Sequence, residues 1–258
     1  MYIRPVHAEL NIPVLHQFIR ENPLGLFTTS IPHSKNATLQ TTHIPFVLDS
    51  PLNEDDEQDK GILRGHMARA NPQTKSIIDQ LNESGESELN EEVLILFNSP
   101  VHSYVTPKFY VDTKPKDGKV VPTWNYSAVQ VYGKAKIYYK NNEESSFFLQ
   151  NQIETLSNQN EIQLETKRGK ENEKKFWKVS DAPTKYVDLL KKAIIGLEIK
   201  IDRIEGRFKL SQESGDDDWL GVVDGYKSLN TEEGDKLAEV IEDRGKNREI
   251  SKKNGCPV

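Results

Sequence analysis

The sequence predicts an α+β protein in which an antiparallel sheet or barrel carries added helices. Predicted strands outnumber predicted helices along the 258 residues. They follow one another as neighbours with short turns between them, which favours antiparallel pairing over a doubly wound sheet. The motifs G-x-G-x-x-G, G-x-x-x-x-G-K-[ST], H-E-x-x-H and G-x-S-x-G are absent from the sequence, which argues against Rossmann, P-loop, zincin and α/β-hydrolase chemistry.

The first elements are a helix and a hairpin. Asn11 can cap a short helix, and "NPLG" at 22–25 ends it. Strand patterns follow at 24–31 and 37–48, and Pro, Ser and Asn between them supply turn chemistry. This arrangement predicts a β-hairpin.

The next stretch combines an acidic loop, a strand and a helix. Residues 49–60 predict a solvated acidic loop. A third strand is predicted over 61–68. Asn71 and Pro72 then have the residue types expected for the cap and first position of a helix.

The middle of the chain contains two strands and a polar segment. The apolar run "VLILF" at 93–97 predicts a strand buried on both faces, and clean alternation predicts another strand over 125–139. A helix built on Phe148 and its apolar neighbours follows. The strongly polar residues 157–175 predict a flexible surface excursion.

Three elements complete the chain. They are a helix over 182–194, with Tyr186, Leu189, Leu190 and Ala193 in register, an alternating strand over 195–210, and an amphipathic helix over 231–245. The pattern predicts a barrel domain over 1–210, which includes the polar excursion, and a helical extension over 211–258.

Composition limits the class of protein. The net charge of −6 argues against bulk nucleic-acid binding. The single cysteine, Cys256, excludes an internal disulfide and a cysteine-based metal site, and suits a reducing compartment. The N-terminus lacks an apolar signal core, and the apolar runs are too short to span a bilayer. We therefore expect a soluble, cytoplasmic protein without a membrane partner.

A dense basic corner is the first candidate site. Arg64, His66 and Arg69 lie at the predicted strand-to-helix junction, just before Asn71. Basic side chains and the unpaired N–H groups of a helix N-terminus both favour an anion at such a corner. The alternative, that all three side chains are merely solvated, stays open on these residues alone.

Three further stretches carry polar or aromatic side chains in unusual places. Thr41 and His43 share one face of a predicted strand where apolar residues are expected, although a wet sheet face would explain them equally. Trp124, Asn125 and Tyr126 offer aromatic area and an amide for a flat heteroaromatic ligand, although Trp is also a common core anchor. Lys209 ends a strand with a donor, which is a weak signal by itself.

These stretches together resemble the PaiB family, described as FMN-binding-type negative transcriptional regulators. The motifs fall in order over residues 1 to about 225. They are "MYIRPVHAE" (1–9), "HIPF" (43–46), "LRGHMARANPQ" (63–73), "SPVHSYVTPKFY" (99–110), "VPTWNY" (121–126) and "GRFKLSQ" (206–212). The departures lie at 49–60, 113–119 and 157–175.

The resemblance implies a split β-barrel of the FMN-binding type, related to pyridoxamine-phosphate oxidases and flavin reductases. It also implies a homodimer with FMN in a cleft between subunits. Arg69, with His66 beside it, is then expected to hold the phosphate, and Gly65 to permit close backbone approach. Trp124, Asn125 and Tyr126 are expected to reach the ligand from the partner subunit. The candidate cofactor-binding residues are Thr41, His43, Gly65, His66, Arg69, Asn71, Trp124, Asn125, Tyr126 and Lys209.

Three functions follow as hypotheses. The first is FMN-dependent redox chemistry on a small molecule, with no catalytic residue assigned. The second is haem binding or haem breakdown on the same barrel, with His7, His43, His66 or His102 as axial ligand. The third is a ligand-responsive transcriptional regulator. Because no helix-turn-helix or basic recognition helix is present, we expect no direct DNA contact.

Overall fold

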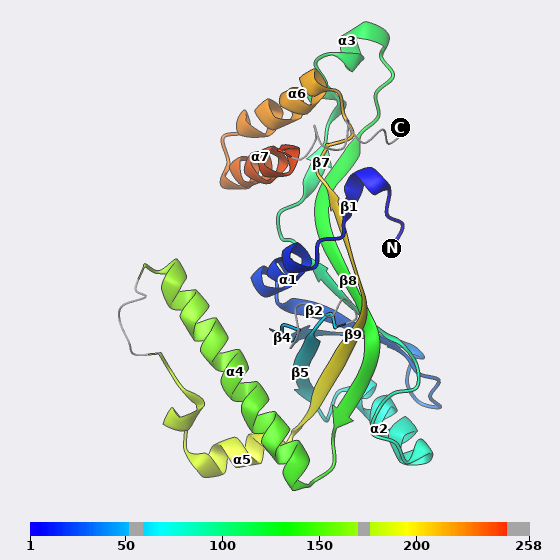
Figure 1. The fold of residues 1–258 in the computed structure, drawn as a ribbon, viewed down its shortest axis with the longest axis vertical. Helices are drawn as coiled ribbons and strands as arrows, with labels where there is room; N and C mark the ends of the chain where they lie inside the picture. Colours follow the sequence, from blue (N-terminus) through cyan, green and yellow to red (C-terminus); the bar gives the residue numbers. More distant parts are fainter. Residues whose placement is uncertain (52–58, 170–175, 247–258) are drawn as a thin grey trace. The chain divides into compact units, whose positions relative to one another are not determined.

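The computed structural model describes residues 1–51, 59–169 and 176–246. The chain divides into two compact units, each of which is described by itself (Figure 1). Unit 1 comprises Met1–Phe18, Asn98–Gln130 and the chain from Glu205 onward, and unit 2 comprises Ile19–Phe97 and Val131–Ile204. Most of the acidic loop predicted at 49–60 lies outside the described residues.

Unit 2 is a curled antiparallel sheet with helices added, which confirms the predicted α+β split-barrel class. Its strands follow the order β3-β2-β6-β8-β9-β5-β4. The strands are β2 (Leu24–Ser30), β3 (Leu39–Pro45), β4 (Val47–Asp49), β5 (Ile62–Ala68), β6 (Val93–Asn98), β8 (Thr123–Tyr138) and β9 (Ile194–Lys209). Of the last two, only the part of β8 from Val131 and the part of β9 up to Ile204 belong to unit 2. The helices are α2 (Pro72–Ser84), α4 (Glu143–Lys167), η3 (Val179–Asp181) and α5 (Thr184–Lys192).

Strand pairing confirms the hairpin and shows the curl. β2 and β3 pair antiparallel from Leu24 opposite Pro45 to Ser30 opposite Leu39. β5 lies between β4 and β9, yet it also contacts β3 from the far end of the strand order. The two ends of the sheet therefore approach each other, as a half-closed barrel requires.

The predicted alternation of β8 is confirmed. The residues of the predicted face are all buried: Val129, Val131, Gly133, Ala135 and Ile137. At Gly133 an added Cβ would lie 2.0 Å from the carbonyl oxygen of Lys200. β9 thus passes too close to β8 for any side chain at this position.

Within a single copy of the chain, only one face of the "VLILF" strand is fully buried, so the chain alone does not bury both faces as predicted. Val93, Ile95 and Phe97 are buried, whereas Leu94 and Leu96 are only half-buried. Leu94 pairs with Thr28 and Leu96 with Leu26 on the outer face of the sheet. A continuous apolar run does not by itself show which strand face has a covering layer.

The prediction of an irregular excursion at 157–175 is wrong for residues 157–167. These residues continue α4, which begins at the Asn142 cap, where the side chain accepts a hydrogen bond from the Ser145 N–H at 2.9 Å. The segment holds Glu, Gln, Leu and Lys but no Gly or Pro before Gly169, so helix propensity favours continuation. Residues 170–175 lie outside the described residues.

Helix α5 forms as predicted, but its apolar residues are not buried. Tyr186, Leu189 and Leu190 are each about half exposed or more. Helix α5 packs against α4 in unit 2. Helical periodicity therefore predicted the element correctly but not its burial.

Unit 1 is built around a helical hairpin beside the remaining strand segments. Its core contains Val105, Leu210, Val222, Val223, Tyr226, Leu237, Ala238 and Ile241. The elements are η1 (Pro5–His7), β1 (Ala8–Glu9), α1 (Ile12–Glu21), β7 (Ser103–Val105), η2 (Pro107–Phe109), α3 (Thr113–Asp117), α6 (Asp216–Lys227) and α7 (Glu232–Gly245). Asn11 caps α1 as predicted, since its Oδ1 accepts from the Val14 N–H at 3.1 Å.

The predicted division at residue 210 stays a prediction. Helices α6 and α7 follow that position, and they share their compact unit with Met1–Phe18 and Asn98–Gln130. Within the described ranges, no helix is long and apolar enough to cross a membrane.

Candidate functional site

The corner between β5 and α2 is built as the sequence predicts. The Asn71 N–H donates to the Ala68 carbonyl at 3.1 Å, which turns the chain. The Asn71 side chain then accepts from the Gln73 N–H at 2.8 Å, and Pro72 opens the helix. Asn71 is therefore a true helix cap.

The neighbouring strand contributes to this corner through Thr42. The Thr42 hydroxyl accepts from Asn71 Nδ2 at 2.9 Å and donates to Gln73 Oε1 at 2.6 Å. Thr41 and His43, which the sequence singles out, point to the opposite face and are exposed. Thr41 instead meets Thr28 across the hairpin at 2.9 Å. The alternation of β3 was predicted correctly, but the face that meets the corner was not.

Gln73 is a site residue that sequence reasoning missed. It is 1% exposed, and its Nε2 donates to the Phe27 carbonyl, the Thr29 hydroxyl and the Gln40 carbonyl at 3.0–3.2 Å. A polar residue two positions after a helix cap gives no sign of burial in the sequence. Its partners come from both strands of the hairpin, which fixes α2 to β2 and β3.

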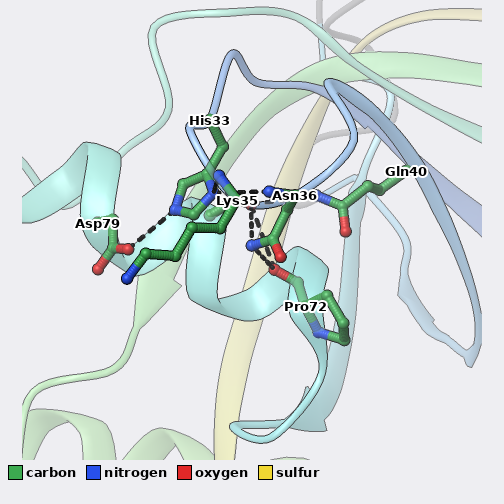
Figure 2. A network of polar contacts seen from close by, with 7 residues as sticks. His33, Lys35, Asn36, Gln40, Pro72 and Asp79 are labelled. Carbon is green, nitrogen blue, oxygen red and sulfur yellow. Dashed lines mark hydrogen bonds and ion pairs between the residues drawn. The ribbon is translucent and has the colours of Figure 1, made fainter.

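A second network ties the hairpin loop to α2 (Figure 2). His33 Nδ1 accepts from the backbone N–H groups of Lys35 and Asn36, each at 3.1 Å, so its Nε2 carries the proton and donates to Asp79 at 3.0 Å. Asn36 Nδ2 donates to the Pro72 carbonyl at 3.2 Å. The loop that joins β2 to β3 is thereby held on the helix that leaves the corner.

The expectation that the α2 N-terminus receives an anion stays a prediction. Asn71 already caps the first turn, and Gln73, Thr74 and Ser76 are at most 1% exposed.

Two other corner residues differ from expectation. Gly65 is buried, and an added Cβ would lie 3.0 Å from Ile44 and 3.1 Å from Phe46. The side chains that approach the Gly65 backbone are therefore core residues of the chain itself. Burial lowers the pKa of His66, and its Nδ1 is buried without a hydrogen-bond partner among the described residues. His66 is therefore neutral at neutral pH and adds no charge for a phosphate.

Arg64 has a structural role. Its guanidinium forms a two-bonded ion pair with Asp49 at 2.5 and 2.9 Å. It also donates to Gln152 of α4 at 3.2 Å, and Gln152 in turn donates to the Arg64 carbonyl at 3.2 Å. Helix α4 thus covers the outer face of β5. The alternative interpretation, in which the Arg64 side chain is merely solvated, is therefore wrong.

Arg69 remains the candidate for anion binding. Its Nη2 donates to the Tyr139 carbonyl at 2.5 Å, and no described carboxylate pairs with it. Partial burial lowers the pKa of Arg69 from its very high ordinary value, and the guanidinium stays charged at neutral pH. It lines a cleft at the start of α4 together with Lys140, Lys191 and Lys192.

Unit 1 carries the aromatic group of candidates. Trp124 lies on β8 opposite Tyr104 of β7, and both side chains are 47% exposed. Trp124 Nε1 donates to His102 Nδ1 at 3.3 Å, and the Trp124 and Tyr104 rings meet edge to face. The exposed rings form an aromatic surface. Trp124 is therefore not the core anchor of the alternative interpretation.

The neighbours of Trp124 have different environments. Asn125 is fully buried, its Oδ1 accepts from the Ser211 hydroxyl at 3.1 Å, and its Nδ2 has no partner in the described part of the chain. Tyr126 is half-buried, and the Arg207 guanidinium lies 5.6 Å from its ring centre. Asn125 therefore supports the strand end, while Trp124 and Tyr126 offer accessible rings.

Lys209 belongs to a partly buried charge cluster. Its Nζ donates to the Thr123 hydroxyl at 2.6 Å and lies 3.4 Å from Glu213. His7 Nε2 lies 3.2 Å from the same carboxylate. Burial opposes ionisation of Glu213, but contacts with His7, a backbone N–H and Lys209 outweigh it and lower its pKa to about 2.

A family model described as "Putative FMN-binding domain" matches residues 1–203 of the chain. An uncharacterized protein of Emericella nidulans is 51% identical over 251 residues, which cover 95% of this chain and 98% of that protein. The protease synthase and sporulation protein PAI 2 of Bacillus subtilis is 27% identical over 244 residues, which cover 95% of this chain and 98% of that protein. Among solved structures, the flavocytochrome Anf3 of Azotobacter vinelandii aligns over 85% of this chain and 78% of its own, with a TM-score of 0.44 and 9% identity.

Proposed function

The chain belongs to the family of FMN-binding domains whose model spans residues 1–203, and from this premise we propose that it performs redox chemistry on a small molecule. The predicted resemblance to the PaiB family is confirmed by this membership and by the Bacillus subtilis relative. FMN is therefore the cofactor. When bound, its isoalloxazine ring supplies one- and two-electron transfer.

The residues of unit 2 fit the phosphate of FMN. Arg69 is a half-buried cation without a carboxylate partner among the described residues, which is the observation that carries the placement. A phosphate oxygen can accept from the guanidinium nitrogens that the Tyr139 carbonyl leaves free. Asn71 acts indirectly, because its cap and its bond to Thr42 hold the backbone from which Arg69 projects.

Thr41 and His43 are proposed to face the ring rather than the phosphate. Both lie exposed on the outer face of β3, and both can donate hydrogen bonds to a polar ring edge. In the same proposal, Trp124 and Tyr126 of a second copy supply stacking area, with Lys209 nearby as a fixed charge. Asn125 is buried and serves to hold the strand end.

The two other hypotheses have less support. Of the four histidines considered for haem, His7 lies against Glu213, His66 has its Nδ1 buried, and His102 accepts from Trp124 through its Nδ1. The rings of His43 and His102 are both exposed. An absorption spectrum with added FMN, and separately with added haemin, distinguishes flavin from haem binding. A gel-shift assay at a stated salt concentration tests direct DNA contact, which we do not expect.

The direct test is to titrate FMN into wild type and into Arg69→Ala and to compare the two Kd values. Charge-assisted hydrogen bonds to an anion contribute on the order of 1.5–3 kcal/mol, so we expect a roughly tenfold to hundredfold rise in Kd. Arg69→Lys should recover only part of the affinity, because an ammonium cannot form two parallel bonds. An unchanged Kd in Arg69→Ala would remove the phosphate from this residue.

A further inference from the structure

The cleft at the start of α4 carries an excess of positive charge. It has a volume of about 560 Å³ in unit 2. Its lining residues include Arg69, Lys140, Lys191 and Lys192 against a single carboxylate, Asp188.

The pairing inside the cleft leaves most of this charge uncompensated. Asp188 pairs with Lys191 at 3.1 Å, and Lys191 also donates to Gln150 at 2.8 Å. No carboxylate in the described ranges pairs with Arg69, Lys140 or Lys192. Three cations that converge on one hollow without an internal counter-charge favour an anionic ligand.

Neutral donors lie beside these cations. Ser145 lines the cleft and is 6% exposed. Ser146 lines the same wall. A serine hydroxyl in the wall of a cleft can donate a hydrogen bond to a phosphate oxygen. Asn142 already caps the first turn of α4, and Glu143 and Glu144 lie in that turn, so the proposal depends on the cations of the cleft and not on the field of the helix.

We propose that this cleft binds a phosphate monoester through Arg69, Lys192 and Ser145, with Lys140 at its edge. The cations neutralise the two negative charges of the monoester, and Ser145 donates to one of its oxygens. If the bound monoester is FMN, this proposal rests on the proposed function. The FMN phosphate then lies beside the start of α4 and not at the N-terminus of α2, where the sequence predicts it. A second phosphorylated ligand offers the same chemistry, and the experiments separate the two sources.

The first experiment compares FMN with riboflavin, which has the same ring but no phosphate. Both are titrated at fixed ionic strength against wild type, Lys192→Gln and Ser145→Ala. Lys185→Gln, an exposed lysine of α5 outside the cleft lining, is the matched control. We expect roughly three- to tenfold weaker FMN binding in the first two variants, no change for riboflavin, and no change in the control. Asp188→Asn should tighten FMN binding because it frees Lys191.

The second experiment uses inorganic phosphate and needs no flavin. Phosphate at constant ionic strength should shift the backbone amide signals of Ser145 and Ser146 in NMR spectra, and Lys192→Gln should weaken that response severalfold. If phosphate binds in the cleft but the Kd of FMN is unchanged in Lys192→Gln and Ser145→Ala, the cleft is a phosphate site for a second ligand. If neither FMN nor phosphate responds to Lys192→Gln or Ser145→Ala, the proposal is overturned. A wild type that binds neither FMN nor riboflavin would instead refute the proposed function, and the phosphate titration would still decide the cleft.

Discussion

At the scale of single residues, the basic residues of the corner have separate roles. Arg64 pairs with Asp49, His66 is neutral, and Arg69 keeps an unpaired charge among the described residues. Sequence spacing placed all three on one short stretch, but it could not show which of them has a carboxylate from another strand. The choice of Arg69 therefore depends on tertiary contacts.

Glu213 allows a pH prediction. Its pKa falls from 4.5 to about 2 in the folded state, so the stability gained from its ionised form is complete above pH 4.5 and is lost as the pH falls towards 2. Because the side chain is partly exposed, we expect a contribution of roughly 2 kcal/mol at neutral pH. Glu213→Gln should be less stable than wild type by about this amount at pH 7 in urea unfolding.

The same comparison at low pH is the control for Glu213. The stability difference between wild type and Glu213→Gln should shrink steadily between pH 4.5 and pH 2, since protonated Glu213 resembles glutamine in charge. A difference that stays constant over this range would show that packing, and not ionisation, explains the variant.

At the scale of elements, Gln73 is the main link between α2 and the β2–β3 hairpin. Gln73→Leu keeps the volume but leaves the buried Thr29 hydroxyl and the half-buried Thr42 hydroxyl without this partner. We expect a loss of about 2–4 kcal/mol in the free energy of unfolding, measured by urea denaturation. Lys75→Met, at an exposed position of the same helix, should change stability by less than about 0.5 kcal/mol. Equal effects of the two substitutions would contradict the role of Gln73.

The elements whose signals are local could be predicted from the sequence. Caps at Asn11 and Asn71, the hairpin and the alternation of β8 depend on neighbours within a few residues. Burial could not be predicted in the same way, because it depends on which layer covers a face. The exposed leucines of α5 and the half-buried Leu94 and Leu96 are examples.

The candidate site shows the same limit. Its location at the β5–α2 corner follows from one segment and was predicted. The contact through Thr42, the hub at Gln73 and the lysines around Arg69 depend on segments that are far apart in the sequence, up to Lys192, and no local pattern joins them.

At the scale of the whole molecule, the candidate residues form two groups in two compact units. Unit 2 supplies Arg69 and the outer face of β3, and unit 1 supplies the aromatic surface around Trp124. A cofactor cleft between two copies, as the resemblance implies, uses one group from each subunit. The assembly is therefore part of the proposed function.

The outer sheet face of unit 2 is the surface that we propose for this dimer. Leu24 and Leu39 are 55% and 69% exposed, and Leu26, Leu94 and Leu96 are half-buried beside them. Apolar side chains that lie accessible on one sheet face are typical of an interface between copies, which would bury them. This face also borders Thr41 and His43, which the flavin proposal needs.

We predict a homodimer that buries more than roughly 2,000 Å² in total through this face. Leu26→Glu places a charge on this face opposite Leu96, so sedimentation should show wild-type dimers and Leu26→Glu monomers at micromolar concentration. The variant should also lose FMN affinity, because the second group of ligand residues would be absent. Lys134→Glu, an exposed charge change on β8, is the control and should stay dimeric. A monomeric wild type that still binds FMN tightly would refute the shared cleft, since one copy would then hold every group that the flavin requires.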